Sequence, residues 1–236
     1  MLIDGGDESA GDTVYNVLEK KKIQHLDILV ISHMHADHIG GLPKVLTYAS
    51  KIDKTLANSS YGQTAAFRKL EHELGINGSK ITVPHVGDVY QFGSAEIEVV
   101  DVASSSENDS LVLMITYGKT RFLFTGDIET EAQDRICQKY QNEKGKIYKI
   151  DLIKIPHHGA ESSSGVNVPG VKYTMLDIFA PDYGIISVGA GNKYKHPAQI
   201  TLERLEQADV KVYRTDKNGD IIVHSDGKTV SVECTK

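Results

Sequence analysis

Cysteine is scarce in this chain, and its scarcity limits the kinds of site that the chain can build. The 236 residues include two cysteines, Cys137 and Cys234, which stand far apart and in no paired motif. A disulfide framework or a thiolate metal site needs several cysteines at short spacings. Neither is therefore indicated, and the cysteines leave the cellular compartment open.

Long apolar runs are also absent. The longest, 28–31 and 111–115, are far shorter than the roughly 18 residues that a membrane-spanning helix needs. The first residues have no basic segment and no long apolar stretch, so they do not form a signal peptide as they stand. We expect no membrane segment in this chain, and an extracytoplasmic location only if a leader has been removed from its start.

Basic residues are fewer than acidic ones. With 26 basic and 32 acidic residues, the formal net charge is −6. A protein that binds duplex DNA mainly by neutralising phosphates carries an excess of Lys and Arg. The charge therefore argues against a general duplex-DNA binder, although bound metals or a local basic patch would change this balance.

Hydrophobic residues make up 40% of the chain, which is enough for a substantial core. Short β-rich runs alternate with amphipathic stretches, and this alternation predicts a layered α/β protein. Strands are predicted at 1–3, 28–32, 80–82 with 88–92, 97–102, 111–117, 121–125, 150–155, 184–188, and a closing pair at 210–214 and 221–224. Helices are predicted at 13–21, 42–49, 63–74, 129–140 and 198–207. Hairpin turns are predicted at 117–121 and 216–220, and a long exposed loop at 160–170. No linker or repeat divides the chain, so we predict a single domain over residues 1–236.

Histidine or aspartate follows the carboxyl end of four predicted strands. The residues are His33, His35, Asp37 and His38 after the first, Asp127 after the second, His157 and His158 after the third, and His196 beyond the fourth. Open α/β sheets bind ligands outside the carboxyl ends of their strands, so these side chains are expected at one edge of the molecule. Converging imidazoles and carboxylates without cysteine indicate a metal site.

The segment 33–38 carries most of this argument. His33 and His35 alternate in an extended turn and can face one ion, while Asp37 and His38 face another. The two carboxylate oxygens of Asp127 can bridge two ions, which two-metal sites hold roughly 3.5–4 Å apart. Three imidazoles and a carboxylate packed behind a buried strand would desolvate one another without a cation. The pattern therefore predicts two ions.

Other interpretations of the remaining residues stay open at this point. Asp127 can cap the helix that follows it, and this role is compatible with metal ligation. His157 and His158 can form a structural pair, and His196, which precedes a proline, can serve as a helix-entry residue.

These segments resemble the metallo-β-lactamase superfamily and, within it, the metallo-hydrolase domain of the ComEC competence proteins. The shared segments are 2–6 (LIDGG), 32–41 (SHMHADHIGG), 108–113 (NDSLVL), 124–127 (FTGD), 156–159 (PHHG), 185–189 (IISVG), 196–197 (HP) and 212–216 (VYRTD). They cover nearly the whole chain. The resemblance implies an αββα four-layer sandwich of the metallo-β-lactamase type, with a dinuclear site that hydrolyses phosphodiesters, DNA above all.

The resemblance also assigns roles to the site residues. His33 and His35 match ligands of the first metal; Asp37, His38 and His196 match ligands of the second; and Asp127 matches the bridge. His157 and His158 match a motif beside the metals and, with Asp37, are the predicted catalytic residues. The expected nucleophile is a hydroxide that bridges the metals. Imidazole ligands suit zinc or iron and carboxylates admit manganese, so we expect two divalent metal ions, zinc or manganese.

The chain departs from the family pattern in three places. Segment 106–110 lacks a histidine that many members place there, so we expect the first metal either to be weakly held or to be completed by Asp109 or water. Ala160 stands where the family motif has serine. The chain also begins inside the family's N-terminal region, so we expect the first strand of the fold to be missing.

The expected partner is single-stranded DNA or another phosphodiester, and a full-length relative would add a membrane channel. The nearest basic residues along the sequence are Lys44, Arg68, Lys69, Lys193 and Lys195, which either contact the DNA backbone or are ordinary solvated side chains. Two alternatives remain for the function. The same site hydrolyses a small phosphodiester or another ester, or the domain binds metal but is catalytically impaired.

Overall fold

The computed structural model describes residues 1–102, 109–143, 148–165 and 173–236. The chain forms two compact units. Unit 1 comprises Met1–Val86 and Val102–Leu111, and unit 2 comprises Gly87–Asp101 and Val112–Lys236.

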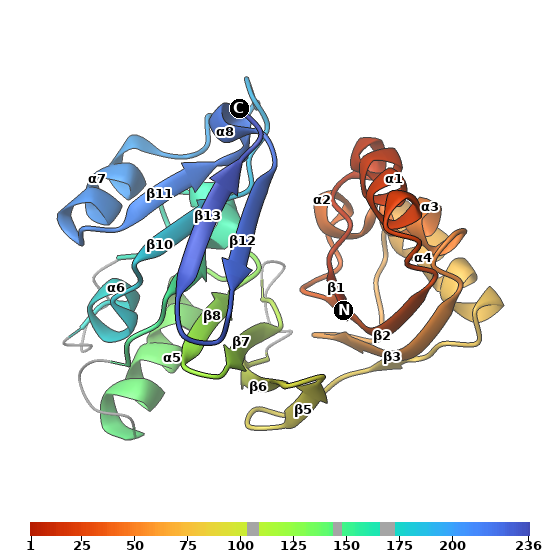
Figure 1. The fold of residues 1–236 in the computed structure, drawn as a ribbon, viewed down its shortest axis with the longest axis horizontal. Coiled ribbons are helices and arrows are strands. Elements are labelled where there is room, and N and C mark those ends of the chain that lie inside the picture. The colour runs from red at the N-terminus through yellow and green to blue at the C-terminus, as the bar shows by residue number, and fades with distance from the viewer. Residues whose placement is uncertain (103–108, 144–147, 166–172) are drawn as a thin grey trace. The chain divides into compact units, whose positions relative to one another are not determined.

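Unit 1 is built on a four-stranded parallel sheet with the strand order β1-β2-β3-β4. The strands are β1 (Leu2–Ile3), β2 (His25–Ile31), β3 (Lys51–Ala57) and β4 (Ile81–Thr82). Helical segments connect them, as parallel strands require. They are the 3-10 helix η1 (Glu8–Ala10), α1 (Gly11–Lys20), α2 (Ala36–Ile39), α3 (Leu42–Leu46) and α4 (Ala65–Ile76). Helices α1, α3 and α4 lie over one face of this sheet (Figure 1).

The core of unit 1 forms between β2 and these helices. Leu29 and Ile31 of β2 pack with Leu42 of α3 and Leu70 of α4, and all four side chains are buried. A strand inside a parallel sheet is buried on both faces, and its sequence is therefore a continuous apolar run. The last four residues of β2, Ile28 to Ile31, are all apolar and all buried.

Residues 109–111 also belong to unit 1. The backbone N–H of Leu111 donates to the carbonyl of Ser32 at 2.8 Å, directly beyond the end of β2. The Asn58 side chain, just beyond β3, donates to the carbonyl of Asp109 at 2.6 Å. The chain therefore returns to unit 1 between two strands of unit 2.

Unit 2 contains a mixed seven-stranded sheet with the order β11-β10-β9-β8-β7-β6-β5. Its antiparallel half consists of β5 (Val89–Phe92), β6 (Ala95–Asp101), β7 (Val112–Tyr117) and β8 (Thr120–Phe124). Strands β9 (Leu152–Lys154), β10 (Tyr183–Ile186) and β11 (Lys211–Arg214) continue the sheet in parallel with β8. Strands β12 (Ile221–Ser225) and β13 (Val230–Cys234) form a separate antiparallel pair. The helical segments are α5 (Thr130–Glu143), η2 (Pro156–Gly159), α6 (Met175–Phe179), α7 (Gln199–Gln207) and α8 (Thr215–Asn218).

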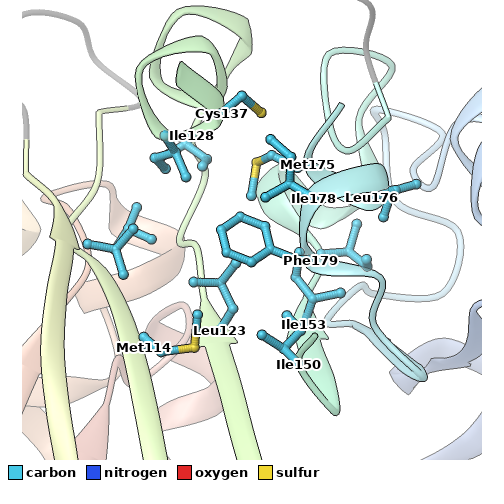
Figure 2. Close-up of a cluster of buried hydrophobic side chains, with 14 of the residues drawn as sticks. Met114, Leu123, Ile128, Cys137, Ile150, Ile153, Met175, Leu176, Ile178 and Phe179 are labelled. Carbon is cyan, nitrogen blue, oxygen red and sulfur yellow. The ribbon is translucent and has the colours of Figure 1, made fainter. Parts of the chain in front are cut away.

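Phe179 of α6 lies at the centre of the unit 2 core, among Leu123 of β8, Ile153 of β9 and Ile178 (Figure 2). Cys137 of α5 is buried in the same cluster. Burial raises the pKa of its thiol to about 12, with Asp134 and Asp177 adding to the effect. This cysteine is a core residue.

Several predicted elements differ from the structure. The strands predicted at 210–214 and 221–224 are present as β11 and β12, but their predicted pairing is wrong, because β11 pairs with β10 while β12 pairs with β13. The turn predicted at 216–220 is the short helix α8, where Asn218 Oδ1 accepts from the backbone N–H of Arg214 at 2.8 Å. The segments 80–82 and 88–92 lie in different sheets, and β3 and β13 were not predicted.

The hairpin turn at 117–121 is confirmed by pairing of Tyr117 with Thr120. The part of the predicted loop at 166–170 lies outside the described residues.

Parallel strands place their carboxyl ends at the same edge of a sheet, and this arrangement positions the polar residues within each unit. In unit 1, the end of β1 leads to Asp4 and the end of β2 leads to Ser32 and His33. In unit 2, β8, β9 and β10 lead in the same way to Asp127, to His157 and His158, and to the loop before His196. Across the described ranges, no helix is long and apolar enough to cross a membrane.

Candidate metal centre

Three imidazoles gather directly after β2 in unit 1. The rings of His33 and His35 have centroids 4.6 Å apart, and those of His33 and His38 are 4.1 Å apart. His33 and His38 are buried, whereas Asp37, in the first turn of α2, is exposed. The extended backbone of His35 at the N-terminus of α2 turns its ring back toward His33. The structure therefore brings together three of the histidines that the sequence singled out.

Asp4 and Ser32 form hydrogen bonds with two of these rings, those of His33 and His38. Asp4 Oδ1 accepts the backbone N–H of Ser32 at 2.8 Å, while Oδ2 accepts the Ser32 hydroxyl at 2.7 Å and lies 2.8 Å from His38 Nδ1. The Ser32 hydroxyl also lies 3.1 Å from His33 Nδ1. A hydroxyl that donates to Asp4 can accept from His33, so Nδ1 carries the proton in both rings. The lone pair then lies on Nε2, as a metal ligand requires.

The carboxyl of Asp4 is ionised for a clear physical reason. Burial alone would raise its pKa, but the hydrogen bond and charge of His38, together with the bonds from Ser32, hold its pKa below the usual value. Sequence reasoning gave Asp4 no role. The available signal was its place in the LIDGG segment, immediately after an apolar strand.

Close backbone packing fixes the turn that carries these histidines. The N–H of Gly5 donates to the carbonyl of His38 at 2.8 Å, and the N–H of Gly41 donates to the carbonyl of Gly6 at 3.0 Å. A Cβ atom on Gly41 would collide with the Gly5 carbonyl oxygen. Only glycine allows the two segments to approach this closely.

A second group of site residues gathers in unit 2. Asp127, just beyond β8, is buried, and its Oδ2 lies 3.3 Å from His158 Nε2. His158 Nδ1 lies 2.7 Å from the carbonyl of Ser187, just beyond β10. A carbonyl can only accept, so Nδ1 carries the proton and the Nε2 lone pair faces Asp127. His157 and His158 both adopt left-handed backbone conformations (φ 46° and 53°), a strained arrangement that is common at functional sites.

His157 and His196 complete this second group. The ring of His157 lies 5.8 Å from that of His196 and 6.4 Å from that of His158. His157 Nδ1 is 3.3 Å from Glu129 Oε1, a carboxylate that the sequence did not single out. Burial lowers the pKa of His196, as do the neighbouring His157 and His158, while Asp127 acts in the opposite direction.

The basic residues named from the sequence have different surroundings. Lys69 pairs with Glu8 at 2.6 Å, and Lys44 lies 3.5 Å from Asp12. Arg68 donates to the carbonyl of Gln63 at 3.0 Å. The position of Asn108 lies outside the described residues.

A family described as "Beta-lactamase superfamily domain" matches residues 2–160, more than half of the chain. The chain belongs to the metallo-β-lactamase superfamily. Among curated relatives of this superfamily member are ComE operon protein 3 of Bacillus subtilis, 29% identical over 86% of the chain, and Competence protein ComA of Neisseria gonorrhoeae, 28% identical over 93%. Recombination protein 2 of Haemophilus influenzae is 28% identical over 84%. These matches cover 25%, 28% and 22% of the relatives, so the chain spans about a quarter of their length.

Solved structures confirm the predicted metallo-β-lactamase fold for this superfamily member. The metallo-β-lactamase fold protein YhfI of Bacillus subtilis matches 97% of the chain and 85% of its own length, with a TM-score of 0.51 at 12% identity. The diiron β-hydroxylase CmlA of Streptomyces venezuelae matches 81% of the chain and 44% of its own, with a TM-score of 0.52 at 15% identity.

The donor atoms of this metallo-β-lactamase domain fit divalent cations. The superfamily is one of metal-dependent hydrolases and is typically dinuclear. Both groups of site residues offer imidazole nitrogens and carboxylate oxygens, the ligands that zinc and manganese accept. The hydrogen bonds to Nδ1 of His33, His38 and His158 leave Nε2 as the ligand atom in each.

Proposed function

We propose that this chain is a two-metal phosphodiesterase that cleaves DNA, with single-stranded DNA as its substrate. The observation that carries the proposal is the cluster of His33, His35 and His38. Hydrogen bonds from this cluster to Asp4 and Ser32 fix which ring nitrogen of His33 and of His38 carries the proton. The choice of DNA draws on the relatives, one of which is named for competence and another for recombination. Both words describe processes that handle DNA.

The proposed ligands are those that the sequence suggested. His33 and His35 would hold a first ion, Asp37, His38 and His196 would hold a second, and Asp127 would be shared by the two. Zinc and manganese are the ions that suit these donors. Two such cations would supply Lewis acidity toward the phosphoryl oxygens and would lower the pKa of a water molecule to near 7.

The two adjacent histidines of η2 receive different roles. The Nδ1–H of His158 donates a hydrogen bond to the carbonyl of Ser187, and Nε2 faces Asp127. This is the arrangement of a metal-ligating histidine, so we add His158 to the proposed ligand set. His157 Nδ1 lies 3.3 Å from the Glu129 carboxylate, which can orient the ring, and among the described residues its Nδ1 is not paired with a backbone carbonyl as that of His158 is. We therefore assign His157 as the group that donates a proton to the leaving oxygen. Asp37 orients the attacking water.

The first test is metal content together with turnover. The purified chain is expected to bind two metals and, with manganese or zinc, to hydrolyse bis(p-nitrophenyl) phosphate and labelled single-stranded DNA. His35→Ala and Asp127→Ala are expected to lower turnover of both substrates by at least about 100-fold, with the far-ultraviolet circular dichroism unchanged. His224→Ala, which changes an exposed histidine of β12, is the matched control and should retain full activity.

Other results lead to other functions. Two bound metals with cleavage of the small ester alone would replace the DNA nuclease with a small phosphodiesterase. One metal or none, without turnover, would identify a catalytically impaired domain. Full activity in both His35→Ala and Asp127→Ala would contradict the proposed site.

A further inference from the structure

The loop after β10 presents an exposed aromatic ring beside the histidines of unit 2. The Tyr194 side chain is 64% exposed, and its ring lies 17° from parallel to that of His196, with the centroids 5.8 Å apart. The His196 ring in turn lies 5.8 Å from that of His157. An aromatic ring in this position offers a flat apolar face immediately next to the proposed site.

The side chain of Asn192 holds this loop in shape. Its Nδ2 donates to the carbonyl of Gly189 at 3.1 Å and to that of His196 at 2.7 Å, and its Oδ1 accepts the His196 N–H at 2.9 Å. The N–H of Lys195 also donates to the Asn192 carbonyl, at 3.1 Å. A ring held by a preorganised loop loses little conformational freedom when a ligand stacks on it.

One ammonium group lies near the ring, and a second lysine follows it in the sequence. Lys193 Nζ lies 4.8 Å from the centroid of the Tyr194 ring, and Lys195, also exposed, follows directly. Neither lysine has an ion pair among the residues that the structure describes, whereas Lys44 and Lys69 lie close to carboxylates. The loop therefore carries local positive charge on a chain whose net charge is −6.

We infer that Tyr194, Lys193 and Lys195 form a nucleotide-stacking subsite that binds a base and adjacent phosphates of single-stranded nucleic acid. The inference rests on the proposed function and adds the residues that select a polynucleotide over a small diester. Base stacking on an aromatic ring tolerates any sequence, and lysines follow the backbone. A stacked base takes the place of the Lys193 ammonium over the ring, which frees that ammonium to pair with a phosphate.

The test compares two dye-labelled oligonucleotides of equal length, one an oligothymidylate and the other abasic throughout. Fluorescence anisotropy of the full chain in EDTA measures binding without cleavage. Wild type is expected to bind the oligothymidylate more tightly. Tyr194→Ala should weaken that binding about tenfold, since stacking contributes ~1–3 kcal/mol per base, and should leave binding of the abasic strand unchanged. Tyr194→Phe should restore the preference for bases.

The lysines are tested by the salt dependence of binding. Lys195 has a left-handed backbone (φ 59°) that glycine adopts without strain, so Lys195→Gly removes the ammonium and suits the loop. Combined with Lys193→Gln, it should weaken binding of both oligonucleotides. The slope of log Kd against log salt should fall by about 1.4, at roughly 0.7 for each phosphate contact. Lys119→Gln with Lys228→Gln removes two exposed lysines elsewhere on unit 2 and should leave the slope unchanged.

The outcomes separate this subsite from the proposed function. Equal binding of both oligonucleotides by wild type, or an unchanged preference for bases in Tyr194→Ala, would overturn the subsite. Hydrolysis of bis(p-nitrophenyl) phosphate by the same preparation with manganese reports on the proposed function alone. A Tyr194-dependent preference for bases without that turnover would support the subsite and overturn the phosphodiesterase.

Discussion

Asp4 shows how strongly the histidine cluster depends on one residue outside the histidine motif. Its two carboxylate oxygens accept hydrogen bonds from the backbone N–H and the hydroxyl of Ser32, and one of them also contacts His38 Nδ1. Through Ser32 it also sets the proton position on His33. A carboxylate behind a ligating histidine fixes the ring and raises its basicity. The affinity for metal therefore depends on a side chain that is not one of the proposed ligands.

Asp4→Asn is expected to lower metal affinity or turnover by about 10- to 100-fold, because the amide can offer its NH₂ where an acceptor is needed. The measurement is metal bound per chain against free manganese, together with hydrolysis of bis(p-nitrophenyl) phosphate. Asp12→Asn, which changes an exposed carboxylate of α1, is the control. Wild-type affinity and turnover in Asp4→Asn would show that the carboxylate only stabilises the fold.

The sequence predicted the histidines of the site better than the groups that support them. His33, His35 and His38 were recognisable because they are dense and follow an apolar run. Asp4 was not, since its partners lie some 30 positions away and only the pairing of β1 with β2 brings them together. Glu129 is the first residue of a predicted helix and lies in no histidine motif, and its contact with His157 depends on the left-handed turn of η2.

At the scale of elements, the junction between α2 and α3 depends on backbone contact. Gly40 and Gly41 pass so close to the segment after β1 that a Cβ on either would strike backbone atoms. This contact places α2, and with it His35 and His38, against Asp4 and its neighbours. The junction is therefore expected to tolerate no side chain.

Gly41→Ala is expected to destabilise the chain by about 1–3 kcal/mol, because the backbone must move to admit the methyl group. Gly75→Ala makes the same chemical change in α4, where an added Cβ meets nothing within 4 Å. There the change should stabilise the chain by ~0.5–1 kcal/mol, since alanine favours a helix more than glycine does. Urea unfolding of both variants measures the difference, and equal effects would contradict the close contact.

The elements that the sequence did not predict share a physical cause. β3 begins with exposed Lys51, Asp53 and Lys54 among buried residues, so neither an alternating nor a continuous apolar pattern appears over its length. The segment after β11 contains Asp, Asn and Gly, which favour a hairpin turn. Asn218 instead accepts from the backbone of Arg214 and supports α8, so the chain leaves the sheet before β12. Pairing partners depend on tertiary contacts that local composition does not encode.

At the scale of the whole molecule, bound metal should act as a stabilising ligand. A ligand that binds only the folded chain stabilises it by about 2.7 kcal/mol when its concentration is 100 times its Kd. The proposed ligands come from the segment 33–38 and from three distant positions, Asp127, His158 and His196, so the unfolded chain does not hold the complete set together.

Removing metal with EDTA is therefore expected to lower the urea midpoint, and adding manganese or zinc should restore it. The double variant His33→Ala/His35→Ala is the control, and its midpoint should respond less to added metal. Unfolding curves of wild type that coincide with and without metal would show that the folded chain has no preferential affinity for the ion.

The return of residues 109–111 to unit 1 also determines how the chain can be divided. A cut after Val86 would leave Asp109 and Leu111 on the second fragment, although their hydrogen bonds are made to Asn58 and Ser32 of the first. The first fragment would then keep all four strands of its sheet but would lose the two hydrogen bonds that residues 109–111 make beyond the ends of β2 and β3. Two genes encoding these fragments would form a complementation pair, in which unit 1 recovers these two hydrogen bonds only when both products are present in the same cell.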